Sequence, residues 1–113
     1  MTTVTLSVAS RDDINQRALA AFDGKSQGAR ISFASADLLW RTLTRKRWEI
    51  LQAMTGQGVL SIREVARRVE RDVKAVHGDV HALIDAGVIE RAGGGFAFPY
   101  EAVHVDFTLT RAA

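Results

Sequence analysis

The sequence predicts a single α+β domain, on three observations. The chain has 113 residues, which is the size of one ordinary domain. Segments that alternate apolar and polar residues lie near both ends, whereas the middle of the chain carries apolar residues at helical spacing. The composition, 47% hydrophobic and 25% charged with one proline, is that of a globular chain. One domain therefore has to carry the function.

Three segments towards the ends have the pattern of strands. Residues 3–8 alternate Val and Leu with Thr and Ser, residues 31–34 (Ile-Ser-Phe-Ala) have the pattern of a short strand, and residues 103–109 alternate strictly. The apolar positions of the last segment, expected on one buried face, are Val103, Val105, Phe107 and Leu109. Because isolated strands are unstable, we expect the three segments to pair with one another or across a dimer.

Two helices are expected around the second strand. The first begins at Ser10, whose hydroxyl can cap a helix, and ends at Gly24. The second begins at Ser35 or Asp37 and contains Trp40. The sequence thus opens with a strand, a helix and a strand.

Three further helices follow in close succession from Thr44 onward. Thr44, Ser61 and Asp72 are suitable N-caps, and Ser61 with Glu64 matches the Ser-x-x-Glu capping box. The inward-facing residues expected are Trp48, Leu51 and either Ile50 or Met54 in the first helix, Ile62, Val65, Ala66 and Val69 in the second, and Val73, Val76, Val80, Leu83 and Ile84 in the third.

A β-hairpin is expected after the third helix. Residues 88–91 and 96–98 are short apolar runs around a tip at Gly93-Gly-Gly95. Three helices followed by a hairpin is the element order of a winged helix-turn-helix, whose third helix can enter the DNA major groove.

The sequence therefore divides into three parts. We expect a strand-helix-strand extension for dimerisation or partner binding over residues 1–43, the winged helix-turn-helix over residues 44–100, and a C-terminal strand over residues 101–113.

The net charge of +2 is unevenly distributed along the chain. Residues 41–74 hold nine Lys or Arg against four Asp or Glu, whereas residues 1–40 are balanced and residues 75–113 carry more acids than bases. A local basic surplus in the helices favours binding of a polyanion such as double-stranded DNA.

The candidate DNA contacts lie on the three middle helices and the hairpin. The outward face of the third helix is small and sparsely charged, which permits close approach to base edges, while arginines in the second helix and its turn can bind phosphate. The candidates are Lys74, Ala75, Gly78 and His81 in the third helix, Arg63, Arg67, Arg68 and Arg71 in the second helix and turn, Arg45 and Arg47 in the first helix, and Arg91 in the hairpin. Alternatively, Arg67 and Arg68 pair with Glu64 and Glu70 on a solvated face.

Several strings in the chain resemble one family. They are Arg-Trp-Glu-Ile-Leu at 47–51, Leu-Ser-Ile-Arg-Glu-Val-Ala-Arg-Arg-Val at 60–69, Asp-Val-Lys-Ala-Val-His-Gly-Asp-Val at 72–80, Leu-Ile-Asp-Ala-Gly-Val at 83–88 and Phe-Pro-Tyr-Glu-Ala-Val-His-Val-Asp at 98–106. With them, the stretch from about Ile31 to Phe107 resembles the MarR-like winged-helix predicted transcriptional regulators of bacteria and archaea. The resemblance implies a sequence-specific DNA-binding regulator. Because such regulators are often encoded beside a small toxin, it also implies an antitoxin that represses its own operon.

The main alternative is a protein-interaction module that neutralises a partner by direct binding, with little DNA binding. We expect a homodimer, with the flanking strands and Trp40 at its interface, and a cognate toxin is a further candidate partner.

An enzyme is not expected. His77 and His81 have the spacing of a metal pair, but a third ligand and a catalytic base are missing from the pattern, and the chain contains no cysteine. We therefore expect no cofactor and no metal. We also expect a cytoplasmic protein, because no apolar run is long enough to span a membrane and the first residues do not form a signal peptide.

Overall fold

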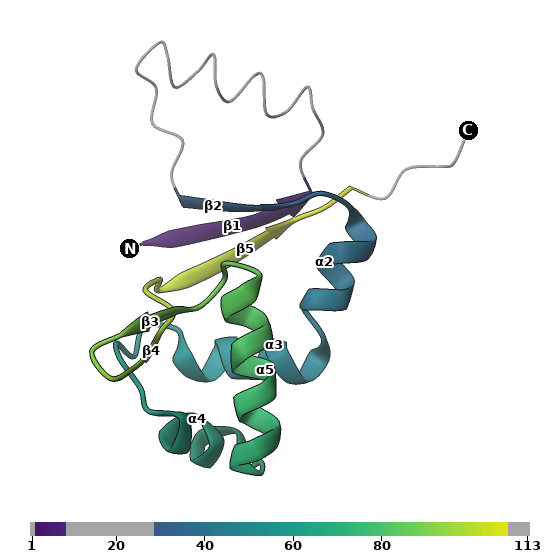
Figure 1. Cartoon of the computed structure of the whole chain (residues 1–113). Helices are drawn as coiled ribbons and strands as arrows, with labels where there is room; N and C mark the ends of the chain where they lie inside the picture. Colours follow the sequence, from purple (N-terminus) through teal and green to yellow (C-terminus); the bar gives the residue numbers. More distant parts are fainter. Residues whose placement is uncertain (1, 9–28, 109–113) are drawn as a thin grey trace.

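The computed structural model describes residues 2–8 and 29–108 (Figure 1). The expected helix from Ser10 to Gly24 and the end of the last segment at Leu109 lie outside the described residues. The described elements are β1 (Thr3–Val8), β2 (Ala29–Phe33), α2 (Ala36–Thr42), α3 (Arg45–Met54), α4 (Ile62–Val69), α5 (Val73–Asp85), β3 (Glu90–Ala92), β4 (Gly95–Ala97) and β5 (Ala102–Asp106). Four helices and two sheets in these residues confirm the α+β class.

The larger sheet joins strands from the two ends of the chain. Its order is β2-β1-β5, and both pairings are parallel. In the register of β1 with β5, Val4 lies opposite Val103 and Leu6 opposite Val105. The three flanking strands therefore pair with one another inside one chain, and the helices form the long connection that parallel pairing requires.

One face of this sheet packs on the helices. Val4 and Leu6 of the central strand are fully buried, and α2 packs against β1 and β2. The expected alternation in β5 is confirmed, because Val103 and Val105 are partly buried whereas His104 and Asp106 are exposed.

The helices begin at the residues that the sequence indicates. Ser35, Thr44, Ser61 and Asp72 each accept a hydrogen bond from a backbone N–H in the first turn of the helix that follows. The carboxylate of Glu64 bonds Arg67 and Arg68, so that side chain is engaged outside the expected capping box.

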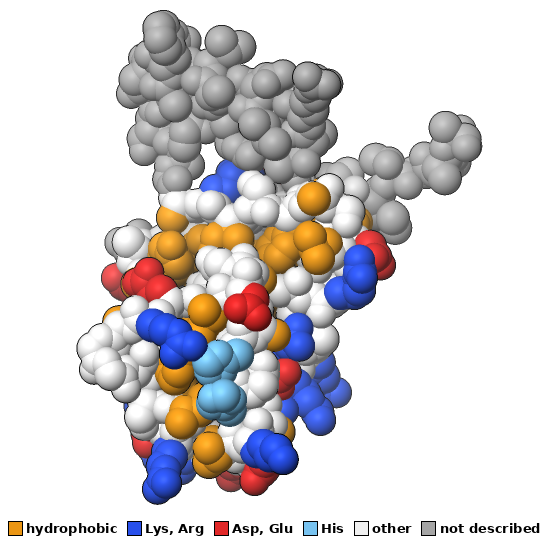
Figure 2. All heavy atoms as spheres, viewed as in Figure 1, with side chains coloured by type: hydrophobic (Ala, Val, Ile, Leu, Met, Phe, Trp, Pro, Cys, Tyr) orange, Lys and Arg blue, Asp and Glu red, His pale blue; other side chains and the backbone are white. Residues whose placement is uncertain are grey.

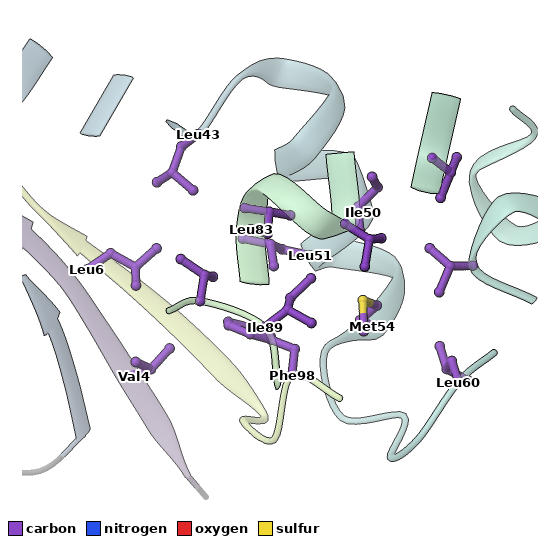
Figure 3. Packing of buried hydrophobic residues seen from close by; sticks show 14 of the residues in the cluster. Val4, Leu6, Leu43, Ile50, Leu51, Met54, Leu60, Leu83, Ile89 and Phe98 are labelled. Carbon is purple, nitrogen blue, oxygen red and sulfur yellow. The ribbon is translucent and has the colours of Figure 1, made fainter. Parts of the chain in front are cut away.

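A single hydrophobic cluster connects the sheet to the helices (Figure 3). Ile50, Leu51 and Met54 of α3 are buried, as are Leu83 of α5 and Phe98 after the hairpin. Some of the expected inward-facing residues are not fully buried. Ile62, Val69 and Ile84 are partly buried against the cluster. Val73 is 41% exposed because it is the first residue of α5, at the helix end far from the sheet, and Trp48 is only partly buried at the edge of the cluster.

The hairpin is fixed to the segment that precedes α4. β3 and β4 are antiparallel, and Leu60 exchanges two backbone hydrogen bonds with Phe96, at 2.9 and 2.8 Å. A Cβ atom at Gly95 would lie 2.6 Å from the carbonyl oxygen of Leu60, so only glycine permits this approach. The hairpin is thereby held against the segment that leads into α4.

Candidate nucleic-acid interface

The outward face of α5 is open and small. Lys74, Ala75, His77 and Gly78 are exposed, and His81 is half-buried. Asp72 caps the first turn of α5, since its carboxylate accepts hydrogen bonds from the N–H groups of Lys74 and Ala75. A Cβ atom at Gly78 would meet nothing within 4 Å, so packing inside the protein does not require glycine there. This face can approach a flat or grooved partner closely.

Figure 2 shows histidine side chains on this face with Lys and Arg side chains around them. The rings of His77 and His81 lie 4.1 Å apart, and Nδ1 of His81 is 3.3 Å from Nη2 of Arg91. The Arg91 guanidinium also lies over the ring of Phe96, 5.7 Å from its centroid. The hairpin arginine is therefore held against α5, so Arg91 and His81 belong to one surface.

Two arginines of α4 share one carboxylate. Glu64 bonds Nε of Arg67 and Nε of Arg68, both at 2.9 Å, and these hydrogen bonds lower the pKa of Glu64 to about 2. The Arg67 side chain is 71% exposed, whereas that of Arg68 is 30% exposed and also donates to Oε1 of Gln57 at 2.8 Å. The expected alternative pairing with Glu64 is thus present, whereas no ion pair of either arginine with Glu70 is found in the part of the chain that the structure describes. Exposed pairs of this kind are weak, so Arg67 is free to turn towards a phosphate.

Arg47 and Arg71 converge on Asp79, in contrast to their expected positions on an open surface. Nε of Arg47 lies 3.0 Å from Oδ1 of Asp79, and Nη2 of Arg71 lies 2.8 Å from Oδ2. The three side chains are only 17 to 24% exposed, and Nη1 of Arg47 also donates to the carbonyl of Thr42. We call these three residues the Asp79 cluster; it ties α3 and the turn after α4 to α5.

The electrostatics of the Asp79 cluster favour the ionised carboxylate. Burial acts to raise the pKa of Asp79, but the hydrogen bonds from Arg71 and Arg47 outweigh it, and the pKa of the carboxyl is lowered. Both guanidinium groups are thus engaged in fixing the orientation of α5. That they contact DNA stays a prediction, and the geometry gives them a positioning role.

The remaining candidates lie at the periphery of this surface. Arg45 is 92% exposed and has Oε1 of Glu49 3.5 Å from its Nε atom, while Arg63 is exposed on α4. The structure therefore brings together the α5 face and Arg91, places Arg67 and Arg63 on the neighbouring helix, and engages Arg47 and Arg71 in ion pairs with Asp79.

Sequence reasoning missed the organising role of Asp79. Asp79 is one of two acids in α5, the other being Asp85, and arginines lie 8 and 32 residues upstream of it, but only the fold shows that these two arginines reach it. His77, which the sequence offered only as a possible partner of His81 in a metal pair or in contacts with phosphate or a base, lies with its ring beside that of His81 on this surface.

In the part of the chain that the structure describes, no three His, Cys, Asp or Glu side chains are placed to hold a metal ion. None of the helices described has the length and hydrophobicity to span a bilayer.

Comparison with known proteins places the chain in a family. No curated protein and no solved structure matches the sequence significantly. Residues 42–105, more than half of the chain, match the model of the HVO_A0114 family, and this segment holds α3, α4, α5, the hairpin and most of β5. The chain therefore belongs to the HVO_A0114 family.

Proposed function

We propose that the protein is a sequence-specific regulator of transcription that binds double-stranded DNA through a winged helix-turn-helix of the MarR-like kind. In this proposal α3, α4 and α5 form the three-helix unit, β3 and β4 form the wing, and α5 enters the major groove. The single observation that carries the proposal is the open face of α5, where Lys74, Ala75 and Gly78 are exposed beside Arg91.

The charged residues on this surface would contribute to DNA binding in two different ways. Arg67, exposed on α4, and Arg63 would contact phosphates, which adds affinity without sequence preference. Lys74 lies in the first turn of α5, where a side chain can donate to guanine O6 and N7. Sequence preference would thus depend mainly on Lys74, and affinity mainly on the arginines of α4.

A titration of labelled duplex DNA at several salt concentrations tests the proposal. Because contacts to phosphate release counterions, log affinity should fall linearly with log salt, with a slope of about −0.9 per phosphate neutralised. R67A should make this slope shallower by about one contact per chain, and K74A should reduce the preference among duplex sequences.

Arg41 provides a matched control. It is as exposed as Arg67, at 72%, but it lies on α2 and pairs with Asp37. R41A should leave the salt slope unchanged. Equal effects of R41A and R67A would indicate a general charge effect and would argue against α4 as the phosphate-binding helix.

The second candidate is the protein-interaction module, and one observation favours it. Trp40 and Leu38 of α2 are 55% and 40% exposed, and Trp40 contacts Phe107 edge to face at 5.9 Å. Exposed large apolar side chains are typical of protein-binding surfaces. An autoregulating antitoxin would use both surfaces, with the toxin bound on the α2 side. If W40A abolishes capture of a co-expressed neighbouring gene product and leaves DNA binding intact, the two functions are separate.

A further inference from the structure

The outer edge of β5 offers backbone groups for a further strand. β5 ends the sheet order β2-β1-β5, so in the described residues only β1 lies beside it. The N–H of Ala102 donates to the carbonyl of Thr2 at 3.1 Å, so the amide of Ala102 points towards the β1 side of the sheet. Since amides alternate along a strand, those of His104 and Asp106 also point towards β1, and those of Val103 and Val105 point outward.

The side chains of β5 form a self-complementary pattern. His104 and Asp106 are exposed on one face of the strand, while Val103, Val105 and the following Phe107 are partly buried on the other. Two antiparallel copies can meet at this edge in two registers compatible with the outward amides. Centring on His104 places the two His104 side chains opposite each other and Asp106 opposite the partner's Ala102, whereas centring on Val105 places His104 opposite the partner's Asp106.

We propose that two copies of this chain associate through antiparallel pairing of β5, centred on Val105. In this register the outward amides of Val103 and Val105 find partners, and a histidine N–H faces a carboxylate on each side of the two-fold axis. The pairing joins the two sheets into one of six strands and covers both β5 edges. The inference does not rest on DNA binding.

A groove beside β5 supports the second copy as its occupant. Trp48, Leu51, Gln52 and Thr55 line it together with Val103, and its volume is about 270 Å³. In the register centred on Val105, the partner's Phe107 lies opposite Val103 and on the same face. That aromatic ring would enter the groove, so the pairing buries apolar surface besides forming backbone hydrogen bonds.

Cysteine cross-linking tests the register directly, because the chain has no cysteine of its own. Opposed residues in a hydrogen-bonded antiparallel pair have Cα atoms about 5.5 Å apart, within disulfide range. V105C should therefore form a covalent dimer in oxidising buffer. The equivalent distance at position 104 is about 8 Å in this register, so H104C should not cross-link. Cross-linking of H104C without V105C would overturn the proposed register.

Charge exchange tests the side-chain pairing. In light scattering, the wild-type chain should have twice the 12.4 kDa mass of one copy at micromolar concentration. H104E places like charges opposite each other and should raise the dimer dissociation constant about tenfold, while H104E/D106K restores opposite charges and should recover association.

The charge-exchange variants change only the exposed positions 104 and 106, so the melting temperature of the isolated chain should change little. A monomeric wild-type chain, or a double variant no tighter than H104E, would overturn the proposal.

Discussion

Removal of the Asp79 carboxylate should destabilise the fold more than a single substitution at a partly exposed position usually does. Asp79 accepts one hydrogen bond from Arg47 and one from Arg71, and D79A removes both. It also leaves two guanidinium groups in a site where Nη1 of Arg71 is already buried without a hydrogen-bond partner. The loss therefore includes unpaired charge as well as missing bonds.

The size of the expected stability loss depends on how deeply the Asp79 cluster is buried. A hydrogen bond to a charged group contributes about 1.5–3 kcal/mol when buried. The three side chains retain 17 to 24% exposure, so solvent screening reduces the sum of the two bonds. We expect D79A to lower the free energy of unfolding by about 2–4 kcal/mol.

Urea unfolding followed by tryptophan fluorescence at pH 7 measures this loss. D37A is the matched control, because the bond between Asp37 and Arg41 is also 2.8 Å long but its side chains are 76% and 72% exposed. D37A should cost about 0–1 kcal/mol. Similar losses in D79A and D37A would refute the reasoning that burial gives the Asp79 cluster its strength.

Three further predictions concern the same fold. The pKa of Asp79 is lowered in the folded state, so the ionised carboxylate stabilises the fold fully above the unfolded-state pKa of about 3.9. This stabilisation is lost as the pH falls through the folded-state pKa. The difference in unfolding free energy between wild type and D79A should therefore shrink below pH 4. G95A should destabilise by about 1–3 kcal/mol in urea unfolding, because the new methyl group meets the backbone of Leu60, and an unchanged midpoint would contradict this close approach. G78A should raise stability by about 0.5–1 kcal/mol, because alanine has a higher helix propensity than glycine and the new methyl group meets nothing inside the protein, yet it should weaken duplex binding if α5 approaches DNA closely; tighter binding would argue against that contact.

Local chemistry made the helix boundaries predictable. Ser61 and Asp72 each cap a helix because their side-chain oxygens accept N–H groups two or three residues ahead, a short-range effect visible in the sequence. The alternation of Val103 and Val105 likewise predicted a strand with one buried face.

Long-range pairing was not predictable in the same way. Parallel pairing of β1 with β5 joins residues about a hundred positions apart, and alternation alone does not choose between partners in the same chain and in another. The roles of the arginines also depend on the fold. In the sequence, Arg67 and Arg71 are equal candidates for contacts with phosphate. The fold places Asp79 2.8 Å from Arg71 and leaves the Arg67 side chain 71% exposed.

Amide chemical-shift mapping with a duplex DNA tests the central claim most directly, because it reports which residues meet the nucleic acid. If α5 and α4 bind the duplex, the largest shifts should occur at Lys74, Ala75, His77 and Gly78 of α5 and at Arg67 of α4. Shifts confined to α2 or β5, or no shifts at a DNA concentration that saturates binding, would contradict it.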